Sequence, residues 1–283
     1  MTLPVFLRGM PQVARQEFLG NVRSVRFLIM AFLLALVVVG GGYGVSGISS
    51  TPGGPGPLLP IGPDLAVFFM IGFISLIVPI FSIVVAFDAV SKERVQGTLD
   101  LLLSRPVSRT GVLLGKFLGA FAAVAFPVSV VIPAGLAAIS LHTGQAPSTV
   151  FAATFYAMTL LIVAYYVLLQ IIFSTLAKTS GTAVLYGVLL WLLFNVLYGI
   201  VTLVIGLAFF PDPAAQEEFN RLSTLGNPGG IASNVMLGAA PASVGRFLGG
   251  ALLDPWQAGV GAAFWFLFLF GLALWTFQRR ATE

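Results

Sequence analysis

The sequence contains no cysteine and a single histidine, His142, among its 283 residues. Disulfide bridges and thiolate metal sites are therefore excluded, and so is a metal centre built from a histidine cluster. We expect His142 to be an ordinary interfacial residue, because no partner ligand lies near it in the sequence. We therefore predict no metal site in this chain.

Charge is also scarce. Charged residues make up only 8% of the chain, whereas soluble domains carry about 25%. So few charges cannot cover a globular surface in water. Hydrophobic residues make up 58%, and several apolar runs reach the length of about 20 residues that a membrane-spanning helix needs. The composition predicts an all-α integral membrane protein of the cell membrane, with residues 1–283 forming one transmembrane domain.

Six apolar runs are predicted to span the bilayer. They cover about 27–47, 65–87, 111–141, 151–173, 183–207 and 257–277. The first run is longer than a signal-peptide core, so we expect it to remain as an uncleaved anchor. Residues 1–26 combine four arginines with an apolar helical face, which favours an interfacial amphipathic helix over a frayed basic tail.

Two connectors are rich in proline and glycine. Residues 48–63 are uncharged and predicted to be irregular. Residues 208–256 form the longest connector, and prolines divide it into apolar pieces too short to span a membrane. These pieces suit re-entrant half-helices that dip into the membrane edge or cap its outer face.

Lysine and arginine are distributed unevenly between the two sides of the predicted bundle. Twelve of the fourteen fall in the N-terminal segment, in 88–116, in the 174–182 loop or at the C-terminus. The other side has only Arg221 and Arg246. The positive-inside rule therefore places both termini in the cytoplasm. Lys116, in the first turns of the third span, is expected to snorkel to the inner headgroups.

Residues that would drive transport or catalysis are missing from the spans. No ionisable residue lies near the centre of a predicted span, which argues against ion coupling within this chain. The sequence contains neither the paired aspartates nor the serine–histidine pair that a membrane protease would need. It also lacks a G-x-x-x-x-G-K-[ST] loop for nucleotide binding. We predict no catalytic residue, so the energy for any movement must come from a partner.

The densest run of charge, residues 88–116, lies between the second and third spans. Ser91 is a candidate N-cap, and apolar residues recur at helical spacing up to Leu103, which predicts an amphipathic helix over about 91–104. Pro106 ends it, and Ser108 can cap the third span. A glycine inside this helix, Gly97, costs about 1 kcal/mol, which a close-packed backbone neighbour would explain. On these grounds alone, a helix that rests on headgroups is equally compatible.

The third span opens with small residues four positions apart. Gly111, Gly115 and Gly119, followed by Ala123, form a small-xxx-small ridge that lets two helices approach closely. The neighbour belongs either to this chain or to a second copy.

The 88–116 segment resembles the signature of type-2 ABC-transporter permeases. That signature has an acidic residue at the end of the second span, then E-R-x-x-G-T-L-x-x-L-L-x-x-P, a hydrophobic residue and S/T-R, and a G-K pair in the third span. The matching residues are Asp88, Glu93, Arg94, Gly97, Thr98, Leu99, Leu102, Leu103, Pro106, Ser108, Arg109, Gly115 and Lys116. Within this family the chain looks most like the permease of the copper-maturation system for nitrous oxide reductase. The sequence itself offers no copper path.

The resemblance implies the permease subunit of an exporter, which pairs with a separate cytoplasmic ATPase and a second permease copy. ATP and magnesium would bind only to the ATPase, and no nucleic acid is involved. The 91–104 helix would be the coupling helix that docks on the ATPase, and residues 1–26 the connecting helix. The implied ATPase-coupling residues are Asp88, Glu93, Arg94, Gly97, Thr98, Leu99, Leu102, Arg105, Pro106 and Arg109. Among them, Asp88 and Arg109 would anchor the helix to its flanking spans.

Polar residues also form stripes on the second, fourth and fifth spans. The candidates for a translocation path are Ser75, Ser82, Tyr166, Gln170, Asn195 and Tyr198. The alternative is that these residues form hydrogen bonds between helices, each worth about 0.6 kcal/mol.

A second hypothesis for function is a subunit that passes ATPase-driven motion to an outer partner, such as a metalloenzyme maturation protein, without moving a substrate. A third, a six-span membrane enzyme, lacks a visible catalytic constellation.

Overall fold

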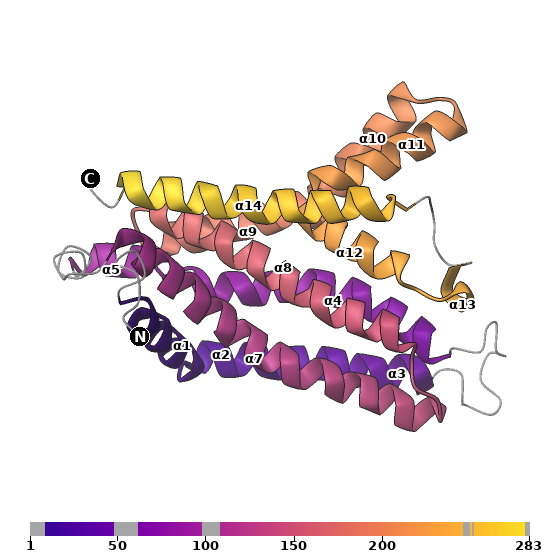
Figure 1. The fold of residues 1–283 in the computed structure, drawn as a ribbon, viewed down its shortest axis with the longest axis horizontal. Coiled ribbons are helices and arrows are strands. Elements are labelled where there is room, and N and C mark those ends of the chain that lie inside the picture. Colours follow the sequence, from indigo (N-terminus) through magenta and orange to yellow (C-terminus); the bar gives the residue numbers. More distant parts are fainter. Residues whose placement is uncertain (1–8, 48–61, 98–107, 246–249, 251, 281–283) are drawn as a thin grey trace.

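The structure, a computed structural model, describes residues 9–47, 62–97, 108–245, 250 and 252–280. Every regular element in these ranges is a helix, as the sequence predicts (Figure 1). Most of the predicted 48–63 connector lies outside the described residues, as does 98–107.

Six helical segments are long and apolar enough to cross a membrane, which confirms the predicted fold class. The first comprises α2 (Val25–Ala35), a π-helix (Leu36–Gly40) and α3 (Gly41–Gly47). The second is α4 (Pro63–Ala86), the third α7 (Arg109–Thr143) and the fourth α8 (Thr149–Leu176). The fifth comprises α9 (Ser180–Leu192), a second π-helix (Leu193–Leu197) and α10 (Tyr198–Phe209), and the sixth is α14 (Pro255–Arg280).

Shorter helices flank the spans. They are α1 (Met10–Val22), α5 (Ser91–Val95), α11 (Pro213–Ser223), a 3-10 turn (Thr224–Gly226), α12 (Pro228–Gly238) and α13 (Ala242–Gly245). Pro11 lies in the first turn of α1, where a missing N–H is tolerated.

Side-chain caps fix where several of these helices begin. Ser24 accepts from the Phe27 N–H at the start of α2, and Ser108 accepts from the Gly111 N–H at the start of α7. Thr179 forms a capping box with Thr182 at the start of α9. Each such cap satisfies backbone donors that the first helical turn leaves free. The cap by Ser108 was predicted from the sequence.

The fourth span lies at the centre of the bundle. In its most apolar 18-residue stretch, 72% of residues are buried, against 6% for the fifth span. α8 packs against α4, α7, α12 and α14, and its buried Phe155, Tyr165 and Tyr166 fill the core. The fifth span lies at the periphery and leaves most of its apolar surface uncovered within one chain.

The two ends of the bundle differ in character. α1, α5 and the last turn of α14 lie at one end, which we call the α1 end (Figure 1). α12 and α13 lie toward the opposite end, where α10 and α11 leave the bundle as a hairpin. α12 packs against α8, α14 and α4, as expected for a half-helix that enters the bundle rather than covering it.

Candidate functional site

The segment that follows α4 forms a short helix against the α1 end of the bundle. α5 begins at Ser91, but it ends at Val95 because Gly97 adopts a left-handed conformation with φ of 66°. The predicted continuous helix over 91–104 is therefore wrong at Gly97. Thr98, Leu99, Leu102, Arg105 and Pro106 lie outside the described residues, so their predicted roles stay predictions.

The structure also changes the reason for Gly97. No described atom lies within 4 Å of the position that a Cβ would occupy there, so close backbone packing does not explain the glycine. Its positive φ does, since only glycine adopts that conformation without steric cost. Gly97 is therefore a turn residue that ends α5.

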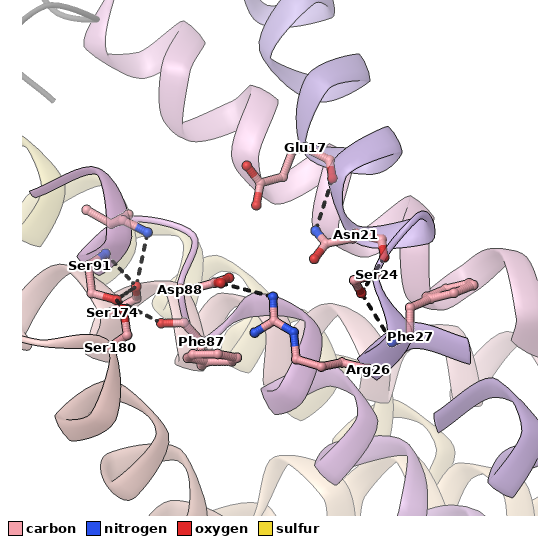
Figure 2. Close-up of polar contacts among 11 residues, drawn as sticks. Glu17, Asn21, Ser24, Arg26, Phe27, Phe87, Asp88, Ser91, Ser174 and Ser180 are labelled. Carbon is pink, nitrogen blue, oxygen red and sulfur yellow. Dashed lines mark hydrogen bonds and ion pairs between the residues drawn. The ribbon is translucent and has the colours of Figure 1, made fainter. Parts of the chain in front are cut away.

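Serine hydroxyls dock this segment onto the junction between α8 and α9 (Figure 2). Ser174 Oγ accepts from the backbone N–H groups of Val90 and Ser91, each at 3.0 Å. The Ser91 hydroxyl itself donates to Phe87 O and lies 3.4 Å from Ser180 Oγ. Ser91 is thus the first helical residue rather than the predicted N-cap. Its N–H is satisfied by a side chain of another span.

Arg94 points back into the chain. Its guanidinium donates to the carbonyls of Thr175 at 2.8 Å and Ala177 at 3.4 Å. Both carbonyls lie at the C-terminal end of α8, where a cation is favoured by the helix dipole. Arg94 therefore ties α5 to α8, a different position from the ATPase-facing one that the sequence suggested.

Asp88 is paired with the start of the first span. Its carboxylate lies 3.0 Å from Arg26 Nη2, and the Arg26 guanidinium lies 4.7 Å from the centre of the Phe87 ring (Figure 2). Arg109 instead donates to the Gln278 carbonyl of α14 at 3.3 Å. The two predicted anchors thus do not meet each other, and each fastens one side of the segment to a different span.

Lys116 is the most buried charge at this end of the bundle, with 1% of its side chain exposed. Its ammonium group donates to Glu93 Oε1 at 2.7 Å and to the Ala89 carbonyl at 2.5 Å. Glu17 Oε2 of α1 lies 3.8 Å away. The expectation that Lys116 reaches the headgroups is wrong, because three acceptors converge on it inside the protein.

The glycine ridge of α7 brings these acceptors together. A Cβ on Gly115 would lie 2.8 Å from the Met10 carbonyl, and a Cβ on Gly119 would lie 2.6 Å from the Ala14 carbonyl. The neighbour that the ridge faces is therefore α1 of the same chain. Gly111, the first member of the ridge, is buried and donates its N–H to the Ser108 cap. Close backbone approach places Glu17 beside Lys116, one turn along the ridge.

An open polar groove of about 400 Å³ adjoins this cluster. Its lining residues are Gln16, Glu17, Gly20, Asn21, Arg26, Asp88, Ala89, Lys92, Glu93 and Gln96. Burial raises the pKa of the Glu17 carboxyl above its ordinary value, and the nearby Glu93 and Asp88 charges raise it further. Lys116 opposes this shift without cancelling it. The ionised form of Glu17 therefore costs stability in the folded chain.

Because the pKa of Glu17 is raised, the substitution Glu17→Gln has an unusual expected effect on stability. At neutral pH the variant is expected to be at least as stable as the parent, although it lacks one carboxylate near Lys116. Because the folded pKa is raised, the gain should shrink as pH falls through that pKa and vanish below the ordinary value of about 4.3. The gain is measured as the difference in apparent melting temperature between the variant and the parent over a series of pH values.

Glu93→Gln is the matched control, because Glu93 accepts directly from Lys116 at 2.7 Å. It is expected to lower the melting temperature at neutral pH. A Glu17→Gln variant that is equally destabilised would contradict the inferred cost of the Glu17 charge.

The six predicted path residues do not gather into one site. Asn195 Nδ2 donates to Tyr166 Oη at 2.9 Å, joining the fifth span to the fourth. Gln170 Nε2 donates to the Ala183 carbonyl at 2.9 Å, and Ser75 Oγ lies 3.1 Å from Ser233 Oγ of α12.

The other two path candidates also have partners within the chain. Ser82 is fully buried and donates to the Val78 carbonyl one turn earlier. Tyr198 donates to the Ser223 carbonyl. These contacts match the alternative interpretation, hydrogen bonding between and within helices, and leave the path a prediction.

Asn227 joins the outer connector to the fifth span. Its Oδ1 caps α12 by accepting from the Gly229 and Gly230 N–H groups, and its Nδ2 donates to the Phe194 carbonyl at 2.8 Å. Phe194 and Asn195 both lie in the π-helix, where backbone hydrogen bonds skip one residue. Periodicity assuming a regular α-helix placed Asn195 on a face but gave no sign of this wider turn.

The sequence did not identify Glu17, Arg26 and Ser174 as the residues that contact Lys116, Asp88 and the start of α5 at the α1 end. Arg26 and Glu17 were visible only as charges in a basic N-terminal segment. Ser174 was predicted to begin the 174–182 loop, where a single hydroxyl by itself has no predictive value. The one usable signal was Lys116 directly after Gly115, since a close-packed ridge buries its neighbours.

A membrane bundle that holds a short, charged helix between its second and third spans, against the end of the fourth, has the architecture expected of a permease. Residues 12–281 match the family described as "ABC-2 family transporter protein", and the chain belongs to this family. It is therefore a multi-pass membrane permease subunit of an ABC transporter, which works with an ATPase subunit.

Two relatives carry the same printed name, "Probable ABC transporter permease protein NosY". The protein of Pseudomonas aeruginosa is 28% identical over 211 residues, covering 68% of this chain and 69% of the relative. The protein of Stutzerimonas stutzeri is 33% identical over 113 residues, covering 38% of this chain and 37% of the relative.

Proposed function

We propose that the chain couples ATP hydrolysis by a separate ATPase to export across the cell membrane, with Asp88–Gly97 as part of the docking segment. The observation that carries this proposal is the fastening of that segment. Asp88, Val90, Ser91, Glu93 and Arg94 each contact a helix outside α5. A helix that merely rested on headgroups would not need fixed contacts to the first, third and fourth spans.

Exposure within the segment suggests which residues face the ATPase. Glu93 and Arg94 are engaged inside the chain, whereas Val95 is 62% exposed and Lys92 and Gln96 are exposed as well. In the proposal, Glu93 and Arg94 therefore hold the segment in place, and Lys92, Val95 and Gln96 contact the partner. Thr98, Leu99, Leu102, Arg105 and Pro106, which lie outside the described residues, are proposed to contact the ATPase as well. ATP and magnesium bind to the ATPase.

Orientation and assembly complete the proposal. Cations gather at the α1 end, among them Arg15, Arg23, Lys92, Arg109 and Lys178, so this end faces the cytoplasm together with both termini. The fifth span exposes an almost unbroken apolar surface within one chain, which supports pairing with a second permease copy. Two permeases and two ATPases would form the transporter.

The test uses a candidate ABC ATPase subunit that is co-expressed with this chain. The two proteins are expected to co-purify, and Val95→Asp is expected to reduce recovery of the ATPase by on the order of tenfold, because it places a charge in an apolar contact. Leu141→Asp is the matched control, since Leu141 is also exposed but lies at the opposite end of α7. Unchanged recovery with Val95→Asp would reject the docking surface.

A second candidate function is transmission of motion to an extracytoplasmic partner without passage of a substrate. The α10–α11 hairpin favours it, because it projects from the bundle and carries Glu217 and Glu218 on its exposed surface (Figure 1). Copurification of a stable outer protein that loses binding on Glu217→Lys would support this function. ATPase activity stimulated by a small molecule or lipid would support export instead.

A further inference from the structure

Lys116 is a buried cation that neither an ATPase contact nor a translocation path would use. It lies in the second turn of α7, and its ammonium group meets groups from two other parts of the chain. The Ala89 carbonyl and Glu93 belong to the segment that follows α4, and Glu17 belongs to α1. Burying an ammonium group is costly unless charged or polar partners surround it, so this convergence needs an explanation.

The packing around Lys116 joins three elements rather than two. On one side, the Gly115 and Gly119 ridge fits α1 so closely that a Cβ at either position would collide with an α1 backbone carbonyl. On the other side, α5 has few contacts with α7 apart from the one between Glu93 and Lys116. The α5 segment is also held at Ser174 and Thr175 of α8. The charge at position 116 is thus a direct link between the Asp88–Gly97 segment and the α1–α7 pair.

We propose that Lys116 is a positioning residue whose ammonium group fastens the Asp88–Gly97 segment to α1 and α7, so that these three elements move as one unit. Displacement of the segment then reaches the third span and the N-terminal helix together. The second span receives the same displacement through the chain itself. That this displacement originates at an ATPase rests on the function proposed above, but the fastening itself does not.

Distances between two labels test the fastening in the full chain without any partner. The sequence contains no cysteine, so cysteines introduced at Gln12 in α1 and Val95 in α5 carry the only spin labels. Both positions are exposed, so labels there have room. The parent chain is expected to give one narrow distance distribution. Lys116→Met is expected to broaden it and to raise the undocked population on the order of tenfold, because two carboxylates lose their buried cation.

Three further variants keep the result interpretable. Lys116→Arg retains the cation and should preserve the narrow distribution, while Arg15→Met removes an exposed cation of α1 and should leave it unchanged. If Lys116→Met fails to fold, Glu93→Gln removes the carboxylate that accepts from Lys116 at 2.7 Å and should broaden the distribution in the same way. A narrow, unshifted distribution in Lys116→Met, or in Glu93→Gln where Lys116→Met does not fold, would overturn the proposal.

Coupling in the assembled transporter separates this proposal from the docking function. If the segment docks and Lys116 fastens it, Lys116→Met should still bind the ATPase but hydrolyse ATP without the matching transport. If the parent chain does not bind the ATPase at all, the docking function is rejected. The distances between the labels would still decide the role of Lys116.

Discussion

Replacing Gly119 by alanine is expected to release α1 from the bundle. The added Cβ would lie 2.6 Å from both the Ala14 carbonyl and Glu17 Cβ, and because both atoms belong to the α1 helix, the helix as a whole must move away. Overpacking of this kind typically costs 1–3 kcal/mol, and we expect about 3 kcal/mol here because the collision is with backbone. Apparent melting temperature reports the loss, and trypsin cleavage at Arg15 and Arg23 reports detachment of α1.

The matched control for this prediction is Gly72→Ala in α4. Gly72 is also a glycine inside a membrane span, but nothing lies within 4 Å of its Cβ position in the chain. Alanine there should raise helix stability by about 1 kcal/mol. Equal effects at Gly72 and Gly119 would mean that the α1 contact does not explain the glycine ridge.

The second large effect is expected at Gly97. Its φ is 66°, a conformation that costs residues with a β-carbon about 1–2 kcal/mol. The cost is largest for β-branched residues. Gly97→Val should therefore redirect the chain after α5 and reduce transport per ATP hydrolysed, whereas Gly97→Asn should retain most of it. Asparagine adopts the left-handed conformation more readily than other residues. The measurement is transport and ATP hydrolysis of the reconstituted transporter.

Gly144 provides the control for backbone strain. It has a nearly identical φ of 71°, but it ends α7 at the opposite end of the bundle. Gly144→Val should cost similar stability and leave the ratio of transport to hydrolysis unchanged. If Gly97→Asn uncouples as strongly as Gly97→Val, then size at this position matters and the conformational explanation fails.

The spans were predictable because each is set by a single property, the length of an apolar run. The observed spans begin and end within three residues of the predicted ones, and Ser108 caps α7 where its sequence context indicated. The start of α5 near Ser91 followed from the choice of this serine as a candidate N-cap, although Val90 is the N-cap in the structure. Its end did not, because a glycine at that position is compatible with either a close-packed helix or a left-handed turn.

The cluster around Lys116 could not be predicted in the same way. It depends on contacts between Glu17, Glu93 and Lys116, which are far apart in the sequence and whose convergence is set by three-dimensional packing. Nothing local distinguishes Lys116 from a lysine that snorkels to headgroups. The partner of the glycine ridge was likewise open, since a small-residue stripe gives no information about which helix it faces.

The π-helix at Leu193–Leu197 has a rotational consequence for the outer end of the fifth span. A π turn accommodates one residue more than an α-helical turn, and each residue advances a helix by about 100°. The side chains of α10 therefore point about 100° around the helix axis from where an unbroken α-helix would direct them. In this register Tyr198 donates to the Ser223 carbonyl of α11, and the π-helix itself presents the Phe194 carbonyl to Asn227. The wider turn thus sets which face of α10 meets α11.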